Sequence, residues 1–231
     1  RTLHGNPTPR GGGIVFSLVF IFFVLFLYLK NVINLDLFLV FGIGAGLSTI
    51  IGYIDDVRGI ASIKKLLLQI LLVSWILYIF NGGPLNMIEL LSGWPSWVIS
   101  IFFLVWLINV YNFIDGIDGL AITGAMLILL TLLLTLIIAN HTSALIPLFL
   151  VLFISCLGFL FFNWPKASIF MGDSGSIFLG YCFGAFIIYS SMMGEISFLT
   201  WLVVFGYYLG DTTTTTIIRT VLGKKWNDAH R

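Results

Sequence analysis

Long apolar runs separated by short polar segments repeat along the whole chain. Most runs come close to the ~20 residues that a helix needs to cross the hydrocarbon core of a bilayer. The pattern therefore predicts an all-α fold, a polytopic transmembrane helix bundle of about eight spans. The predicted spans are residues 14–29, 36–54, 66–80, 97–114, 119–139, 144–162, 175–192 and 197–218.

The amino-acid composition strengthens this prediction. Hydrophobic residues make up 59% of the chain and charged residues 9%, which excludes an ordinary soluble domain. The formal net charge of +1 does not indicate a partner, and no nucleic-acid partner is expected. Cys156 and Cys182 both lie inside apolar runs, so we expect them to pack as small residues and not to form a disulfide or a metal pair.

Charged residues are distributed unequally between the two sides of the predicted bundle. If the loops alternate between sides, Lys30 is the single basic residue on one side, and all the others fall on the opposite side. By the positive-inside rule, the basic side is cytoplasmic. The same side collects most of the acids, and a face rich in both signs indicates a site for a metal and phosphates. These acids are Asp55, Asp56, Asp115, Asp118, Asp173 and Asp228.

The segment from Asn109 to Leu120 places polar side chains at the end of an apolar run. Four of them recur at every third position: Asn109, Asn112, Asp115 and Asp118. Each step of three drifts by about 60° around a helix, so the four side chains cannot all point at one spot while the helix continues. Gly116 and Gly119 allow the helix to end there, so that the carboxylates can converge.

Asp55 and Asp56 form an adjacent acid pair at the end of the second predicted span. A solvated helix end is one interpretation, but acids are disfavoured near a helix C-terminus, where the macrodipole is negative. Because two neighbouring acids also repel each other, we prefer the interpretation that a cationic group binds there. Lys65 begins the next span, where a cation is unfavourable to the helix dipole, and this favours an anionic ligand.

The segment from Phe170 to Ser176 precedes the seventh predicted span and holds Asp173 close to two glycines. Ser174 or Ser176 could cap the helix, and Asp173 could simply favour its positive N-terminus. Alternatively, the glycines let backbone amides approach a phosphate closely. Because the segment faces two other acid clusters, a functional role is the stronger interpretation.

Further candidates lie near the two ends of the chain. His4 and Arg10 belong to a loop rich in Gly and Pro, which either punctuates the chain or contacts a phosphate. Asp211 is expected to be buried within the last apolar run, where an acid is a functional candidate by default. The structural alternative is that Thr hydroxyls or Arg219 neutralise it.

The acids favour a hard, oxygen-binding metal ion. Several carboxylates, few histidines and no paired cysteines indicate Mg²⁺ or Mn²⁺ and not zinc. Mg²⁺ usually binds through one or two carboxylates and completes its coordination with waters and substrate phosphates. A diphosphate substrate is therefore implied, and the membrane setting indicates that the other reactant is a lipid.

Short motifs follow one another along essentially the whole chain. They are Pro7 to Gly13, Gly52 to Asp56, Lys65 to Gln69, Asn109 to Leu120, Asn163 with Phe170 to Ser176, Asp211 with Arg219, and Ala229 to Arg231. In this order they resemble the polyprenyl-phosphate N-acetylhexosamine-1-phosphate transferases, of the glycosyltransferase family 4 type. Each motif alone is weak, but together they are highly specific.

The resemblance implies transfer of a sugar 1-phosphate from a UDP-sugar to undecaprenyl phosphate, with release of UMP and with Mg²⁺ at the cytoplasmic face of the inner membrane. It implies that Asp173 binds the metal, together with Asp118. It further implies that Asp55 and Asp56 hold the lipid phosphate and metal region, with Asp55 a proposed base. Asn112, Asp115 and Asp118 would shape the nucleotide site, and Asn163 and Phe170 would meet the uracil. Lys65 and Arg10 would neutralise phosphates, and His230 would lie near the diphosphate.

The family has more spans than this chain. Residues 1–231 are therefore expected to form a single transmembrane catalytic domain, as a fragment without the first helix and the C-terminal helices. Ala229-His-Arg231 favours the branch that initiates O-antigen, common-antigen and teichoic-acid synthesis over the peptidoglycan branch, which carries consecutive histidines.

Three alternative functions stay open from the sequence. The first is phospho-MurNAc-pentapeptide transfer in peptidoglycan synthesis, and the second is a non-catalytic membrane carrier whose acids follow an ion. A carrier normally places its binding site near the bilayer midplane, whereas most acids here are predicted at one surface. The third is a lipid-binding scaffold without catalysis. The sequence also allows a homodimer.

Overall fold

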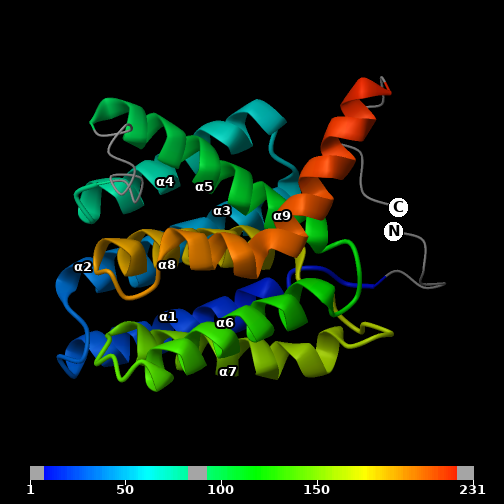
Figure 1. Ribbon diagram of the computed structural model, residues 1–231. Coiled ribbons are helices and arrows are strands. Elements are labelled where there is room, and N and C mark those ends of the chain that lie inside the picture. Colours follow the sequence, from blue (N-terminus) through cyan, green and yellow to red (C-terminus); the bar gives the residue numbers. More distant parts are fainter. Residues whose placement is uncertain (1–7, 83–92, 223–231) are drawn as a thin grey trace.

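The computed structural model describes residues 8–82 and 93–222, and in these ranges every regular element is a helix. In chain order they are α1 (Gly13–Leu29), α2 (Leu35–Phe38), η1 (Leu39–Gly44), α3 (Ala45–Arg58), α4 (Ser62–Ile79), α5 (Trp94–Ile114), α6 (Leu120–Ile138), α7 (Leu145–Asn163), α8 (Gly172–Met192) and α9 (Phe198–Val221) (Figure 1). The all-α prediction is confirmed.

Six of the helices in the described residues are long and apolar enough to cross a membrane. The first of them, Leu35–Arg58, is continuous through α2, η1 and α3, and the others are α4 to α8. Helix α1 is a shorter apolar helix of 17 residues. The last predicted span forms α9, but Asp211 and the Thr212–Thr216 stretch make its second half polar, and it is not among the six. The chain is a multi-pass membrane protein.

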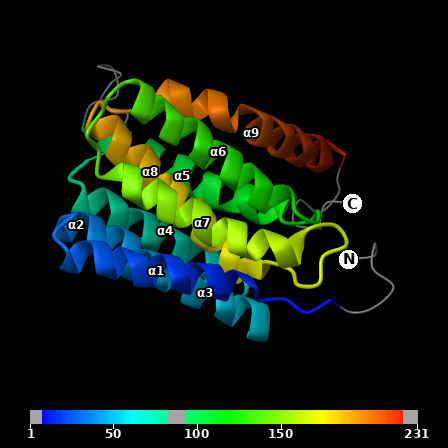
Figure 2. The same cartoon turned by 90° about the horizontal axis from the view of Figure 1, so that it is seen from below.

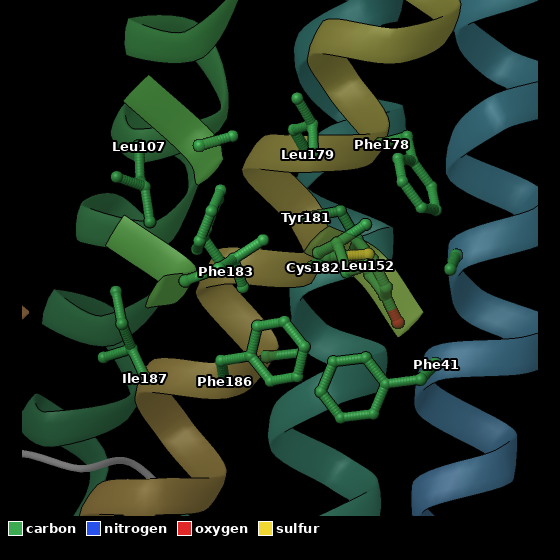
Figure 3. Packing of buried hydrophobic residues seen from close by; sticks show 14 of the residues in the cluster. Phe41, Leu107, Leu152, Phe178, Leu179, Tyr181, Cys182, Phe183, Phe186 and Ile187 are labelled. Carbon is green, nitrogen blue, oxygen red and sulfur yellow. The ribbon is translucent and has the colours of Figure 1, made fainter. Parts of the chain in front are cut away.

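Helix α8 is the centre of the bundle. Nearly all its side chains are buried, and it packs mainly against α3, α5 and α1 (Figure 2). Aromatic rings fill much of this interface. Phe186 stacks on Phe41 with ring centroids 4.5 Å apart (Figure 3). Phe183 stacks on Tyr111 with ring centroids 5.2 Å apart. Cys182, also on α8, is a buried free thiol, which agrees with its expected packing role.

Small residues let neighbouring backbones approach α8 closely. A Cβ added at Gly13 of α1 would collide with the backbone of Gly175, and one at Gly52 of α3 would collide with the carbonyl of Asp173. Within a membrane, such close contact is a main source of helix association, because lipid tails are as apolar as the side chains. The first turn of α8 is therefore held between α1 and α3.

The η1 segment is a π-helical turn inside a long membrane-spanning helix. In this region the indole N–H of Trp75 donates to the carbonyl of Leu39 at 3.2 Å, and the hydroxyl of Tyr181 donates to the carbonyl of Val40 at 3.2 Å. An irregular backbone at membrane depth is tolerated when neighbouring groups satisfy it, as these two donors do. The contacts also fix α4 and α8 against the same turn.

The loops sort to two ends of the bundle, as the alternating spans predict. At one end, the hydroxyl of Ser143 before α7 donates to the carboxylate of Glu195 before α9 at 2.6 Å. The turns that precede α4, α6 and α8 lie at the other end, towards the right in Figure 1. Most of the candidate site residues belong to this second end.

We expect Gly180→Ala to destabilise the bundle by about 1–3 kcal/mol, the usual penalty for overpacking a close-packed interface. The new Cβ would lie 2.6 Å from the Cα of Ile108 on α5, and backbone cannot move aside as a flexible side chain can. The measurement is the free energy of unfolding in mixed detergent micelles. Gly206→Ala is the matched control, because its Cβ would meet nothing within 4 Å. Equal stability of the two variants would contradict this account of α8 packing.

Candidate active site

A charged cluster connects four helices at this end of the bundle. The Lys65 ammonium of α4 is 2.7 Å from the Asp55 carboxylate of α3 and also forms an ion pair with Asp173 of α8. From α5, the Asn112 amide donates to Asp173 Oδ1 at 2.9 Å and to the Ser176 hydroxyl at 3.0 Å. The side chains of Lys65, Asp55 and Asp173 are 16%, 12% and 23% exposed, so the cluster is mostly shielded from solvent but not fully buried.

The turn between α3 and α4 brings Lys65 back beside Asp55. Helix α3 ends before Gly59, whose φ of 68° is favourable for glycine. The Ile60 amide then donates to Asp55 Oδ1 at 2.5 Å, while Asp55 Oδ2 faces Lys65. The predicted cationic partner of the acid pair therefore exists, and it is a lysine of the same chain. In residues 8–82 and 93–222, the carboxylates that form ion pairs with Lys65 are those of Asp55 and Asp173.

Asp56 has a different role from its neighbour. Its two carboxylate oxygens accept hydrogen bonds from the backbone amides of Asp173 and Ser174, each at 2.9 Å. Asp56 is thus an N-cap supplied by another helix, and its charge favours the positive end of α8. The alternative that Ser174 or Ser176 caps α8 is wrong, because both serines lie inside the helix and the Ser174 hydroxyl donates to the carbonyl of Met171.

The same contact corrects the predicted phosphate site at the start of α8. The amides that we expected to approach a phosphate are occupied by Asp56. Gly172, with a φ of 74°, is required at this point, since a Cβ there would lie 2.6 Å from Asp56 Oδ2. The glycine permits a carboxylate to approach closely, so the sequence signal for an anion was right, but the anion belongs to the protein.

A second polar cluster joins the turn after α5 to the segment after α7. Asn163 accepts from the amide of Gly119 and donates to the carbonyl of Ile169, both at 3.0 Å. Asp118 Oδ2 accepts from the amide of Ala167 at 3.0 Å. Asp115 lies at the end of α5 and is buried. These contacts hold the segment that leads from α7 into Asp173.

The four polar residues spaced by three separate as the helix geometry predicts. Helix α5 ends at Ile114, so the expected break before α6 is confirmed. Asn109 donates to the side chain of Gln69 at 2.9 Å, on the α4 side, whereas Asn112 donates to Asp173. Asp118 is directed to Ala167. The four residues therefore belong to at least two clusters: Asn112 contacts Asp173, and Asp118 contacts Ala167 beyond the turn that follows α5.

The N-terminal loop is attached to the segment before α8. The Phe170 amide donates to the Pro9 carbonyl at 2.9 Å, and the amides of Gly12 and Gly13 donate to the carbonyls of Phe170 and Met171 at 3.0 and 2.9 Å. Arg10 lies within this paired loop and is exposed. Its guanidinium is therefore carried by a loop that is fixed beside Phe170.

Some predicted positions fall elsewhere. His4 and His230 lie outside the described residues. The expectation that Asp211 is buried is wrong, because Asp211 is exposed on α9.

Ser176 belongs to the charged cluster through its hydrogen bond with Asn112, although the sequence indicated it only as a possible helix cap. Its position one helical turn after Asp173 was the available signal, because residues three apart share a helix face.

The donor set is compatible with a hard divalent ion that takes few protein ligands. In residues 8–82 and 93–222, no group of three or more His, Cys, Asp or Glu side chains is close enough to hold a metal ion. The structure does bring the carboxylates of Asp55 and Asp173 together around one cation, the Lys65 ammonium. Two oxygen ligands of this kind suit Mg²⁺, which usually retains waters and substrate phosphates as its other ligands.

The fold and the site define a multi-pass membrane protein with a cluster of charged side chains at one end of a helix bundle. The sequence profile of glycosyl transferase family 4 matches residues 37–191, which is more than half of the chain. The chain belongs to glycosyl transferase family 4.

Curated relatives agree with this assignment. A Bacillus subtilis protein named "Probable undecaprenyl-phosphate N-acetylglucosaminyl 1-phosphate transferase" is 31% identical over 97% of this chain and 63% of its own length. The phospho-N-acetylmuramoyl-pentapeptide-transferase of Petrotoga mobilis is 34% identical over 82% of this chain and 63% of its own length. The decaprenyl-phosphate N-acetylglucosaminephosphotransferase of Mycolicibacterium smegmatis is 32% identical over 80% and 50%. The chain thus spans between half and two thirds of these relatives.

Proposed function

We propose that this chain forms the catalytic core of a transferase that moves N-acetylhexosamine 1-phosphate from a UDP-sugar to undecaprenyl phosphate and releases UMP. The observation that carries the proposal is the convergence of Asp55, Lys65, Asn112 and Asp173 from four helices at one end of a membrane bundle. The names of the curated relatives support the sugar-phosphate chemistry. The distribution of basic loops supports a site on the cytoplasmic face of the inner membrane.

In the proposed reaction, an oxygen of the lipid phosphate attacks the β-phosphorus of the UDP-sugar in line. The bond from that phosphorus to the bridging oxygen breaks, and UMP leaves with the bridging oxygen. A phosphate monoester is mostly ionised at neutral pH, since its second pKa is about 6, so the attacking oxygen needs no general base. Lys65 and Arg10 would neutralise the transferring and departing phosphates, as cationic groups do in phosphoryl transfer.

We propose Mg²⁺ as the cofactor, with Mn²⁺ as a substitute. When bound, the ion would neutralise charge on the phosphates and orient them. Asp173 is the residue that we assign as its ligand, because Asn112 fixes one carboxylate oxygen and the other faces a cation already. Asp118 was the second predicted ligand. We assign it instead to holding the segment at Ala167, which its hydrogen bond supports.

The positions of the acids argue against a carrier. Asp55 lies in the last turn of α3 and Asp173 in the first turn of α8, so both belong to helix ends. A carrier would be expected to bind its ion near the midplane of the membrane. A site at the membrane surface suits a reaction between a water-soluble nucleotide sugar and a lipid.

A second candidate substrate is UDP-MurNAc-pentapeptide. The similarity to the Petrotoga mobilis enzyme favours it, because this relative is as similar as the one named for N-acetylglucosamine. We place the simpler N-acetylhexosamine first because the motif Ala229 to Arg231 resembles that branch. The product would then begin a lipid-linked cell-surface polysaccharide.

The test uses the full-length natural protein in detergent with undecaprenyl phosphate and separate UDP-sugars. We expect UMP release with UDP-N-acetylglucosamine or UDP-N-acetylgalactosamine, dependent on both the lipid phosphate and Mg²⁺. Release with UDP-MurNAc-pentapeptide alone would establish the second candidate. The transferase proposal would be overturned if none of these donors yielded UMP.

A further inference from the structure

The Lys65 ammonium pairs with the two carboxylates that a divalent cation would need, those of Asp55 and Asp173. The two carboxylates lie next to each other, and the same ammonium neutralises both. A lysine and a metal ion cannot share this space, and their like charges repel strongly at a few ångströms in a shielded environment. Binding of a metal to Asp173 therefore requires the ammonium to leave.

The remaining contacts are arranged so that this exchange can happen without disturbing Asp173. Lys65 contacts Asp173 through Oδ2, whereas Asn112 binds Oδ1 at 2.9 Å. The backbone of Asp173 is fixed independently, because its amide donates to Asp56. The carboxylate therefore keeps its position when Oδ2 is released.

The departing ammonium needs another anionic partner. A lysine side chain is flexible and carries a compact charge, so it can turn to a new anion within its reach. A nucleotide diphosphate bound beside Asp173 offers this partner. Without such an anion, leaving the two carboxylates is unfavourable for a partly shielded cation.

We propose that Lys65 is an internal counter-ion that keeps divalent cations off Asp173 until a nucleotide diphosphate binds. The inference rests on the proposed function for the nature of the anion. Its consequence is that metal and nucleotide bind cooperatively: each strengthens the binding of the other by the same factor, as linkage requires. Metal without nucleotide binds weakly.

The test is a titration of the full-length protein in detergent with Mn²⁺, followed by electron paramagnetic resonance, with and without UDP. No lipid acceptor is added and no turnover is measured. We expect Lys65→Met to bind Mn²⁺ at least about ten-fold more tightly than the natural protein in the absence of UDP, since a nearby like charge has been removed. We expect UDP to tighten Mn²⁺ binding at least about ten-fold in the natural protein, and by a clearly smaller factor in the variant.

Two further variants serve as controls for the Mn²⁺ affinity of Lys65→Met. Lys64→Met removes an exposed neighbouring charge and should leave Mn²⁺ binding unchanged. Asp173→Asn should abolish the tight binding that Lys65→Met creates. If Lys65→Met does not fold, Lys65→Gln replaces it, because it removes the same charge but keeps a polar end.

Equal Mn²⁺ affinity of the natural protein and the Lys65 variants without UDP would overturn the counter-ion role. An equal effect of UDP on both would overturn the coupling. Because neither readout requires sugar transfer, a protein that passes this test and yet releases no UMP would contradict the proposed function and leave the counter-ion role standing.

Discussion

Replacing Asp173 with asparagine is expected to lower UMP release by at least about 10²–10³-fold, the range typical for removing one electrostatic group of an active site. Asparagine has the same shape and can still accept the hydrogen bond from Asn112. It lacks the charge that pairs with Lys65 and that we assign to the metal. The measurement is the initial rate of UMP release from the full-length protein at saturating Mg²⁺ and UDP-sugar.

The matched control for this variant is Asp36→Asn. Asp36 is exposed in the first turn of α2, at the opposite end of the bundle, and its replacement should leave the rate unchanged. Asp173→Asn should also retain its thermal unfolding temperature to within a few degrees, because its backbone contacts with Asp56 persist. Near-normal turnover in Asp173→Asn would remove this residue from the reaction.

Asp56→Ala is expected to reduce both stability and activity. The substitution leaves the amides of Asp173 and Ser174 without their carboxylate partner, and charge-assisted hydrogen bonds contribute about 1.5–3 kcal/mol. We expect a loss of about 2–3 kcal/mol in the free energy of unfolding in mixed micelles. Activity should fall strongly as well, because the first turn of α8 also carries Asp173.

The stability measurement separates two roles for Asp56. If this residue only held the lipid phosphate, as the resemblance implies, Asp56→Ala would reduce UMP release without reducing stability. Asp56→Asn is the graded control: its amide oxygen can cap one of the two backbone amides, so its stability should fall between those of the natural protein and Asp56→Ala. Unchanged stability in both variants would show that capping by Asp56 is unimportant.

Much of the site could be anticipated from local chemistry. An acid pair at the negative end of a helix needs a cation, and Asp55 has one in Lys65. Polar residues spaced by three cannot all face one point on a continuing helix, and α5 indeed ends before Asp115. Both arguments use properties of a single helix, which the residue order contains directly.

The different partners of the neighbouring acids Asp55 and Asp56 could not be predicted from the sequence. Asp55 and Asp56 differ only in direction around α3, and what each direction meets depends on how α4 and α8 pack beside it. The predicted phosphate site at the start of α8 failed for the same reason. A glycine next to helix amides indicates that an anion approaches, but it does not tell whether the anion is a ligand or a carboxylate from another helix.

The residue order by itself determined the all-α membrane bundle and the end at which the acids gather. Apolar run length and the alternation of loops are one-dimensional properties, and a bilayer leaves helices few alternatives. Only the tertiary structure decided the partners on α8: Lys65 pairs with Asp173 as well as with Asp55, and Asp56 accepts from the amides of α8. The pairings with α8 join residues more than a hundred positions apart, and the close backbone contacts of Gly13 and Gly52 with α8 set their geometry.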